Sequence, residues 1–134
     1  MELRNISKAE LDKIIDNHKK WLKSDGTEGE RANLRYANLR SADLSYADLS
    51  YADLDFSAFP LWCGGLNVHI DDKQATQLLY HLVKNVQYSK NTSAKLKRIC
   101  KIKSLVKQAN EFHRVEACGE IVIESKGADD GKED

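Results

Sequence analysis

The sequence predicts a mixed α+β fold in which a short β-solenoid is flanked by helices. Residues 32–56 repeat Ala, then Asn or Asp, then Leu at a fixed spacing of five. A period of five fits neither a strand nor an α-helix, so each unit must turn the chain by a constant angle. On both sides of this stretch, apolar residues recur at spacings of three and four, which is the period of an amphipathic helix.

The repeated units read Ala-Asn-Leu-Arg-Tyr, Ala-Asn-Leu-Arg-Ser, Ala-Asp-Leu-Ser-Tyr, Ala-Asp-Leu-Ser-Tyr and Ala-Asp-Leu-Asp-Phe. This stretch resembles the pentapeptide-repeat family. The resemblance implies a right-handed quadrilateral β-helix, of about 1.5–2 coils if it extends over residues 27–66. The flanks at 59–64 and 112–119 look like those of small family members carried by phages and prophages. That likeness implies a binding protein rather than a catalyst.

If each unit forms one side of the coil, the middle residue of every unit points to the axis. The expected interior residues are Leu34, Leu39, Leu44, Leu49 and Leu54, with Ala32, Ala37, Ala42, Ala47 and Ala52. Residues twenty apart then stack in adjacent coils, which places Tyr36 near Phe56. Continuing the register puts Phe59 and then Gly64 at Leu positions.

An N-terminal helix is predicted from Lys8 to Lys23. Ser7 and Glu10 have the spacing of a capping box, and Gly26 favours the left-handed backbone that ends a helix. His18 lies on the apolar face, where a histidine at the edge of the core is favoured over a ligand. We expect this helix to cover the open end of the solenoid, whose backbone groups would otherwise be unpaired.

A second secure helix is predicted over 72–88, after an N-cap from Asp71 and Asp72. Its apolar positions are Ala75, Leu78, Leu79, Leu82, Val83 and Val86. Residues 91–93 break the helix and cap a new one, and the apolar spacing drifts near 100–103, which indicates two short helices or a kink. Gly119 interrupts the chain, and residues 121–123 form a short strand or dock.

These elements predict a single domain over 1–124. It comprises a capping helix in 1–26, the β-helix in 27–66 and a helical cap of two or three helices in 71–118. Residues 125–134 read as a disordered acidic tail.

Charge is balanced overall but segregated along the chain. Lys plus Arg and Asp plus Glu number 21 each, so no net field steers the molecule toward nucleic acid or membrane. Residues 84–114 nevertheless carry nine basic residues and one acidic residue, whereas 116–134 carry seven acidic and two basic residues. No signal peptide or membrane span is recognisable, and the three cysteines are widely spaced. We therefore expect a cytoplasmic protein with reduced thiols.

The candidates for chemistry are weak. A metal site would have to come from Cys63, His69, His81, His113 and Cys118, which lack the tight ligand pair of structural zinc sites. No motif surrounds any Cys–His pair that could serve as a nucleophile and its base. We therefore expect no catalytic residues, no cofactor and no metal, and a small zinc- or ligand-binding protein remains the second alternative.

Binding is the favoured function, and a protein is the favoured partner. The contact candidates are Tyr46, Tyr51, Asp43, Asp48, Lys97, Arg98 and Lys101. We hypothesise a phage-encoded inhibitor of a host defence or nucleic-acid-handling enzyme, and a homodimer would also cover exposed aromatic surface. The alternative is nucleic-acid binding by the basic C-terminal helices. DNA mimicry is disfavoured, because successive carboxylates lie on different faces of a short coil.

Overall fold

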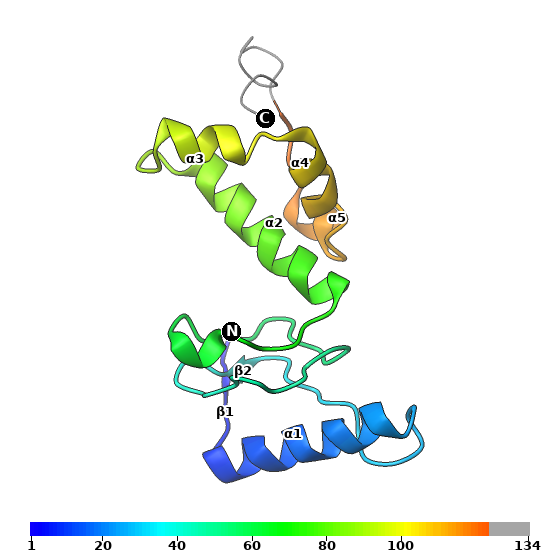
Figure 1. Cartoon of the computed structure of the whole chain (residues 1–134). Helices are drawn as coiled ribbons and strands as arrows, with labels where there is room; N and C mark the ends of the chain where they lie inside the picture. Colours follow the sequence, from blue (N-terminus) through cyan, green and yellow to red (C-terminus); the bar gives the residue numbers. More distant parts are fainter. Residues whose placement is uncertain (124–134) are drawn as a thin grey trace. The chain divides into compact units, whose positions relative to one another are not determined.

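The computed structural model describes residues 1–123, and the chain divides into two compact units, Met1–Asp71 and Asp72–Asp134 (Figure 1). We call them the N-terminal unit and the C-terminal unit. Each has its own cluster of buried apolar residues. The sequence had predicted a single domain, with the last helices serving as a cap. That capping role stays a prediction, and the predicted tail at 125–134 lies outside the described residues.

Helix α1 (Lys8–Lys23) is the long helix of the N-terminal unit and has the predicted bounds. Ser7 Oγ accepts a hydrogen bond from the Glu10 N–H at 3.1 Å, which satisfies one of the free donors of the first turn. Gly26 follows the helix with φ +89°, a conformation that glycine adopts without strain. Leu11 and His18 are the buried residues of this helix.

Two short strands pair in parallel within the same unit. Strand β1 (Arg4–Asn5) lies beside strand β2 (Ala37–Asn38), with Arg4 opposite Ala37. The sequence did not predict β1, because two residues are too short to show the alternation that marks a strand. The chain therefore begins by pairing with its own repeats before it enters α1.

The repeats are held together by backbone rungs between residues about twenty positions apart. The Leu34 N–H donates to Asp53 O, the Leu39 N–H to Ala58 O and the Leu49 N–H to His69 O, each at 2.9 Å. The matching parallel bridges are Asn33↔Asp53, Asn38↔Ala58 and Asp48↔His69. The predicted stacking of residues in successive coils is therefore confirmed.

The repeated leucines fill the interior of these coils. Leu34, Leu39, Leu44 and Leu49 expose no more than 1% of their surface. Leu54 is partly buried against the same cluster. The small alanines Ala32, Ala37 and Ala52 are buried as well, while Ala42 and Ala47 pack partly buried at its edge. The inward direction predicted from the spacing is thus confirmed.

The register changes between the two coils. Leu34 pairs with Asp53 and Leu39 with Ala58, but Leu44 pairs with Gly64 and Leu49 with His69. The second coil therefore contains one extra residue between Ala58 and Gly64. Gly64 is the acceptor of this rung, so the position equivalent to a repeat leucine is the next residue, Gly65. The short 3-10 helix η1 (Cys63–Gly65) takes up this insertion. The predicted Leu position at Gly64 was wrong.

The C-terminal unit contains four helices among its described residues: α2 (Asp72–Tyr88), α3 (Ala94–Ile99), α4 (Lys103–Ala109) and α5 (Val115–Cys118). The bounds of α2 and the break between α3 and α4 are as predicted. Because the single turn of α5 is also helical, the described part of this unit has four helices, whereas two or three were expected. No helix within residues 1–123 is long and apolar enough to cross a bilayer.

The core of the C-terminal unit comprises Tyr80, Val83, Val86, Cys100, Val106, Ala109, Phe112 and Ile121. The predicted apolar face of α2 was partly wrong, since Leu78 and Leu82 are 43% and 59% exposed. Ile121 docks rather than forming a strand. Its N–H and carbonyl are bonded by the Asn110 side chain at 2.8 and 2.9 Å.

Candidate partner-binding surface

The Asn or Asp of each repeat holds its own turn. Its side-chain oxygen accepts a hydrogen bond from the backbone N–H two residues later, as in an Asx turn. The five bonds, from 3.0 to 3.4 Å, run from Arg35 to Asn33, Arg40 to Asn38, Ser45 to Asp43, Ser50 to Asp48 and Asp55 to Asp53. The repeated Asn or Asp is therefore explained by backbone geometry rather than by charge.

Two of these carboxylates, Asp43 and Asp48, had been predicted as partner contacts. Ser45 Oγ donates to Asp43 Oδ1 at 2.6 Å, and this bond together with the Ser45 N–H lowers the pKa of Asp43. Burial alone would raise the pKa of Asp48, but the hydrogen bonds from Ser50 outweigh it and the net pKa is lowered. Both side chains are exposed, yet each has a structural role.

The fifth residue of the unit forms the corner of the coil. Tyr36, Tyr46, Tyr51 and Phe56 have φ angles between +60° and +70°, which is uncommon for bulky side chains. Such a conformation persists where the surrounding structure determines it, and here rungs and Asx turns flank every corner. Ser41, at the equivalent position, does not adopt a positive φ.

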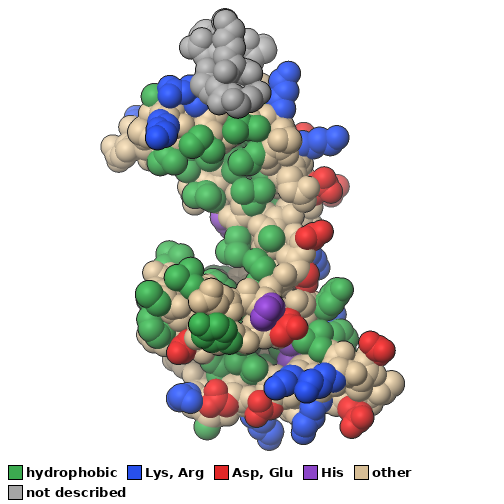
Figure 2. Space-filling view, in the orientation of Figure 1, with side chains coloured by type: hydrophobic (Ala, Val, Ile, Leu, Met, Phe, Trp, Pro, Cys, Tyr) green, Lys and Arg blue, Asp and Glu red, His purple; other side chains and the backbone are tan. Residues whose placement is uncertain are grey.

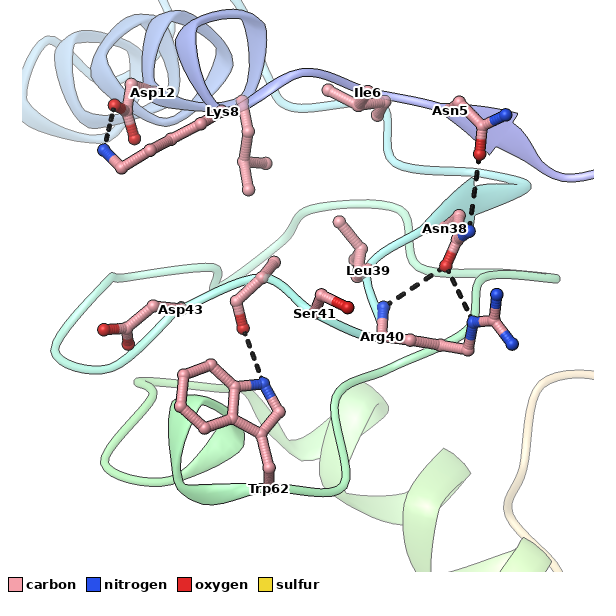
Figure 3. A pocket seen from close by; sticks show the side chains of 12 residues that line it. Asn5, Ile6, Lys8, Asp12, Asn38, Leu39, Arg40, Ser41, Asp43 and Trp62 are labelled. Atoms are coloured by element: carbon pink, nitrogen blue, oxygen red, sulfur yellow. Dashed lines mark hydrogen bonds and ion pairs between the residues drawn. The ribbon is translucent and has the colours of Figure 1, made fainter.

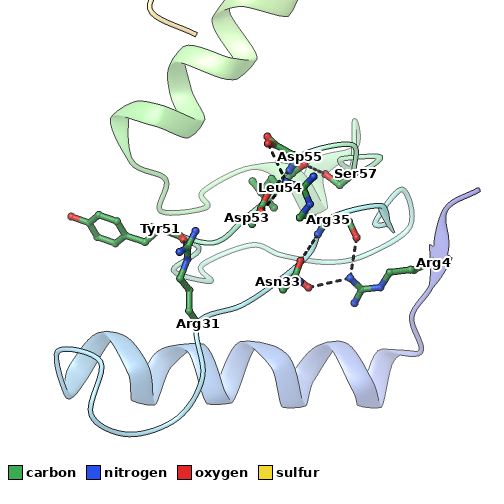
Figure 4. A network of polar contacts seen from close by, with 9 residues as sticks. All are labelled: Arg4, Arg31, Asn33, Arg35, Tyr51, Asp53, Leu54, Asp55 and Ser57. Atoms are coloured by element: carbon green, nitrogen blue, oxygen red, sulfur yellow. Dashed lines mark hydrogen bonds and ion pairs between the residues drawn. The ribbon is translucent and has the colours of Figure 1, made fainter. Parts of the chain in front are cut away.

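One pair of corner aromatics is used inside the N-terminal unit. Tyr36 and Phe56 stack with ring centroids 4.8 Å apart, as predicted. The Arg35 guanidinium lies 5.1 Å from the Phe56 centroid. It also forms an ion pair with Asp53 at 3.2 Å (Figure 4). This contact joins the two coils, so these aromatics have a partner within the chain.

The other two corner aromatics are free of such contacts. Tyr46 and Tyr51 are 78% and 63% exposed. Within residues 1–123 neither side chain makes a hydrogen bond or a ring contact, whereas their backbones are tied to Asn67 and Asp71 at 2.8 and 2.6 Å. Two aromatic side chains thus project from a firmly held backbone.

His18 fastens α1 to the first and last units of the first coil. It is fully buried, and its Nδ1 accepts a hydrogen bond from the Ala32 N–H at 2.9 Å. Because Nδ1 is an acceptor, the proton of the neutral ring is on Nε2, which donates to Ser50 O at 2.9 Å. The prediction of a core histidine rather than a ligand agrees with this arrangement.

Two basic residues of the C-terminal unit donate hydrogen bonds to backbone carbonyls at the ends of its own helices. Lys97 Nζ donates to Val86 O at 2.9 Å, to Gln87 O at 3.2 Å and to Ser89 O, so it satisfies carbonyls at the end of α2. Lys84 Nζ donates in the same way to Gly119 O at 3.0 Å. Lys97 had been predicted only as a partner contact, and its structural role was missed.

The remaining charge differs between the units. Residues 72–123 contain ten Lys and Arg and four Asp and Glu, and Arg98 is exposed on α3 while Lys101 is half-buried just after it. Figure 2 shows Lys and Arg side chains over α3, but basic and acidic side chains intermingled over α1. The excess of positive charge therefore lies in residues 72–123.

The candidate metal ligands are not gathered into a site. Cys63 and Cys118 are exposed free thiols, and Cys100 is buried, which raises the pKa of its thiol. His81 and His113 each lie against the Phe112 ring, at 5.6 and 5.0 Å between centroids. Across residues 1–123, no three His, Cys, Asp or Glu side chains lie close enough to hold a metal ion.

A family model described as pentapeptide repeats (8 copies) matches residues 30–55. Residues 30–55 are therefore a pentapeptide-repeat segment. The matched segment contains the five Asx turns and the buried leucines, whereas most of the rungs join it to residues beyond its end, such as Ala58 and His69. The helices lie outside it. Neither the curated proteins nor the solved structures yield a significant match.

Proposed function

We propose that this pentapeptide-repeat protein acts without catalysis, by binding another protein through Tyr46 and Tyr51. The observation that carries the proposal is the exposure of both rings on a backbone held by rungs and turns. Tyrosine buries a large area on binding and loses little conformational entropy, and this makes it frequent among the residues that dominate interface energies. A firmly held backbone reduces the ordering cost further.

We further propose that the coils form a right-handed quadrilateral β-helix of about 1.5–2 turns. The rungs between successive coils and the corners spaced by five residues support it. Under this geometry Tyr46 and Tyr51 project from neighbouring corners. A crystal structure of the protein tests the hand and the cross-section directly.

The biological setting belongs to the same proposal. We place the protein in the cytoplasm of a bacterium as a phage-encoded inhibitor of a host defence or nucleic-acid-handling enzyme. The resemblance of residues 59–64 and 112–119 to small phage members supports this setting. Inhibition would follow from occupying a surface of the enzyme, and no reaction by this chain is required.

Affinity capture from a bacterial lysate tests the proposal. We expect the natural chain to retain a protein after nuclease treatment, and a Tyr46→Ser, Tyr51→Ser variant to lose it. Tyr88→Ser is the matched control, because Tyr88 is 88% exposed but lies on the C-terminal unit. Retention of the same protein by the double variant would refute the role of these tyrosines. Sedimentation of the purified protein tests the homodimer alternative, in which a second copy covers them.

Nucleic-acid binding is the second candidate, favoured by the excess of basic residues over 72–123. Lys97 is unsuitable for its test because Lys97 holds the end of α2. A Lys95→Glu, Arg98→Glu variant changes exposed charge instead. Capture of nucleic acid that this variant loses, with affinity falling steeply as salt rises, would favour this candidate.

A further inference from the structure

Strand β1 supplies the hydrogen-bond partners for one rung on the outer edge of the first coil. The Arg4 N–H donates to Tyr36 O at 2.7 Å, and Arg4 and Asn5 pair with Ala37 and Asn38. This strand lies on the edge of the first coil that faces away from the second coil, because Asn38 also pairs with Ala58.

The equivalent rung of the next unit is open. Five residues further along, the corresponding groups are Ser41 O and the Asp43 N–H. Within residues 1–123 Ser41 O accepts no hydrogen bond and the Asp43 N–H donates none. The opposite edge of this segment is already occupied, since Trp62 Nε1 donates to Ala42 O at 3.2 Å. An edge with free backbone groups is a template for another strand.

A cavity of about 780 Å³ lies beside this open rung. It is lined by Asn5 and Lys8 on one side and by Ser41 and Asp43 on the other, with Trp62 beside them. Figure 3 shows Lys8 and Asp12 at the start of α1 across the space from the segment that carries Ser41 and Asp43. We call this cavity the open-rung groove.

The sequence explains why the chain does not fill the groove itself. After Asn5 the backbone leaves the ladder, because Ser7 becomes the N-cap of α1. Helical residues bond within their own segment and cannot extend a ladder. Gly64 is needed beside the groove, since a Cβ there would lie 2.4 Å from the Trp62 ring and 2.7 Å from Ala42 O.

We infer that the open-rung groove binds an extended segment of a partner protein, which adds to the coil in parallel. One residue of that segment donates its N–H to Ser41 O, and the segment accepts the Asp43 N–H, in the manner of β1 one unit earlier. Such strand addition derives affinity from main-chain hydrogen bonds. The 49% exposed Trp62 offers an apolar contact beside it.

The lining favours a polypeptide over nucleic acid. The charged residues of the lining are Lys8 and Arg40 against Asp12 and Asp43, so the groove has no net positive charge to attract phosphates. Lys8 is paired with Asp12 at 3.0 Å. Within the described part of the chain, Ser41 O and the Asp43 N–H beside the groove are unbonded, and one acceptor and one donor in this arrangement match a strand. The inference rests on the proposed function for the class of partner, but it uses neither Tyr46 nor Tyr51.

A synthetic peptide with the sequence of residues 1–6 is the probe, because this sequence pairs with the equivalent rung. Amide spectra of the full-length protein are recorded as the peptide is added. We expect a saturable shift of the Asp43 amide and slower hydrogen exchange there, in proportion to occupancy. A peptide N-methylated at its arginine lacks the donor for Ser41 O and should have no effect. An unchanged Asp43 amide, or equal effects of both peptides, would overturn the inference.

Two variants at one position provide a matched control. Asp43→Ala removes the carboxylate but keeps the N–H, whereas Asp43→Pro removes the N–H, which bonds to no other group of residues 1–123. We expect the alanine variant to bind the peptide and the proline variant not to bind it. If the proline variant does not fold, the N-methylated peptide decides. The Tyr46→Ser, Tyr51→Ser variant should bind the peptide normally, so failure here is distinguishable from failure of the tyrosine surface.

Discussion

At the scale of single residues, the acidic side chains of the repeats serve as hydrogen-bond acceptors first and as charges second. Asp43 and Asp48 hold turns, and the pKa of each is lowered in the folded state. A lowered carboxyl pKa stabilises the fold above the unfolded value, about 3.9, and this stability is lost as pH falls through the folded value. Acid should therefore weaken the turns of the N-terminal unit.

Replacing both residues by asparagine tests this explanation. Asp43→Asn, Asp48→Asn keeps an acceptor at every pH, so we expect little change in the free energy of unfolding at pH 7 and a smaller loss between pH 5 and pH 3. Urea unfolding at each pH measures both. The alanine pair is the control and should be destabilised at pH 7 as well. An unchanged acid dependence in the asparagine pair would contradict the assignment.

His18 is the residue on which the position of α1 depends. His18→Ala removes two hydrogen bonds and the packing of a fully buried ring, and we expect the free energy of unfolding to fall by about 2–4 kcal/mol. Lys19→Ala, at the exposed neighbouring position, should change it by less than about 0.5 kcal/mol. Equal effects of the two changes in urea unfolding would show that the His18 contacts are not stabilising.

At the scale of elements, the end of α2 depends on a side chain from the next helix. Lys97→Met keeps the aliphatic stem but leaves the carbonyls of Val86 and Gln87 without this donor. We expect a loss of about 1–2 kcal/mol and faster amide exchange in the last turn of α2. Lys95→Met is the matched control on the same helix. Unaltered exchange near Tyr88 in the Lys97 variant would contradict the capping role.

At the scale of the whole molecule, two separate cores predict two separable unfolding transitions. Both tryptophans, Trp21 and Trp62, lie in the N-terminal unit, so their fluorescence reports on that unit alone. Leu44→Ala should lower the fluorescence midpoint in urea, by a loss of about 2–5 kcal/mol. Val83→Ala should instead lower the midpoint of the helical circular dichroism signal. Equal shifts of both signals in either variant would indicate one cooperative unit.

Part of the fold could be predicted because its signals are local and repeated. The bounds of α1 and α2 follow from capping residues and apolar spacing, and the inward leucines follow from the period of five. Strand β1 was not predicted, because two residues are too few to show a periodic pattern. The exposure of Leu78 and Leu82 was not predicted, because periodicity identifies the apolar face of a helix but not how much of that face is buried.

The sequence by itself determined that the repeats turn the chain regularly with their leucines inward, since a strict period of five admits few backbone paths. The same spacing predicted that Tyr46 and Tyr51 point outward. Only the tertiary structure decided that Lys97 serves α2, that His18 joins Ala32 to Ser50, and that the rung at Ser41 and Asp43 stays open. These roles depend on contacts between residues that are far apart in the sequence. Such contacts produce no periodic pattern, so they cannot be predicted from the sequence alone.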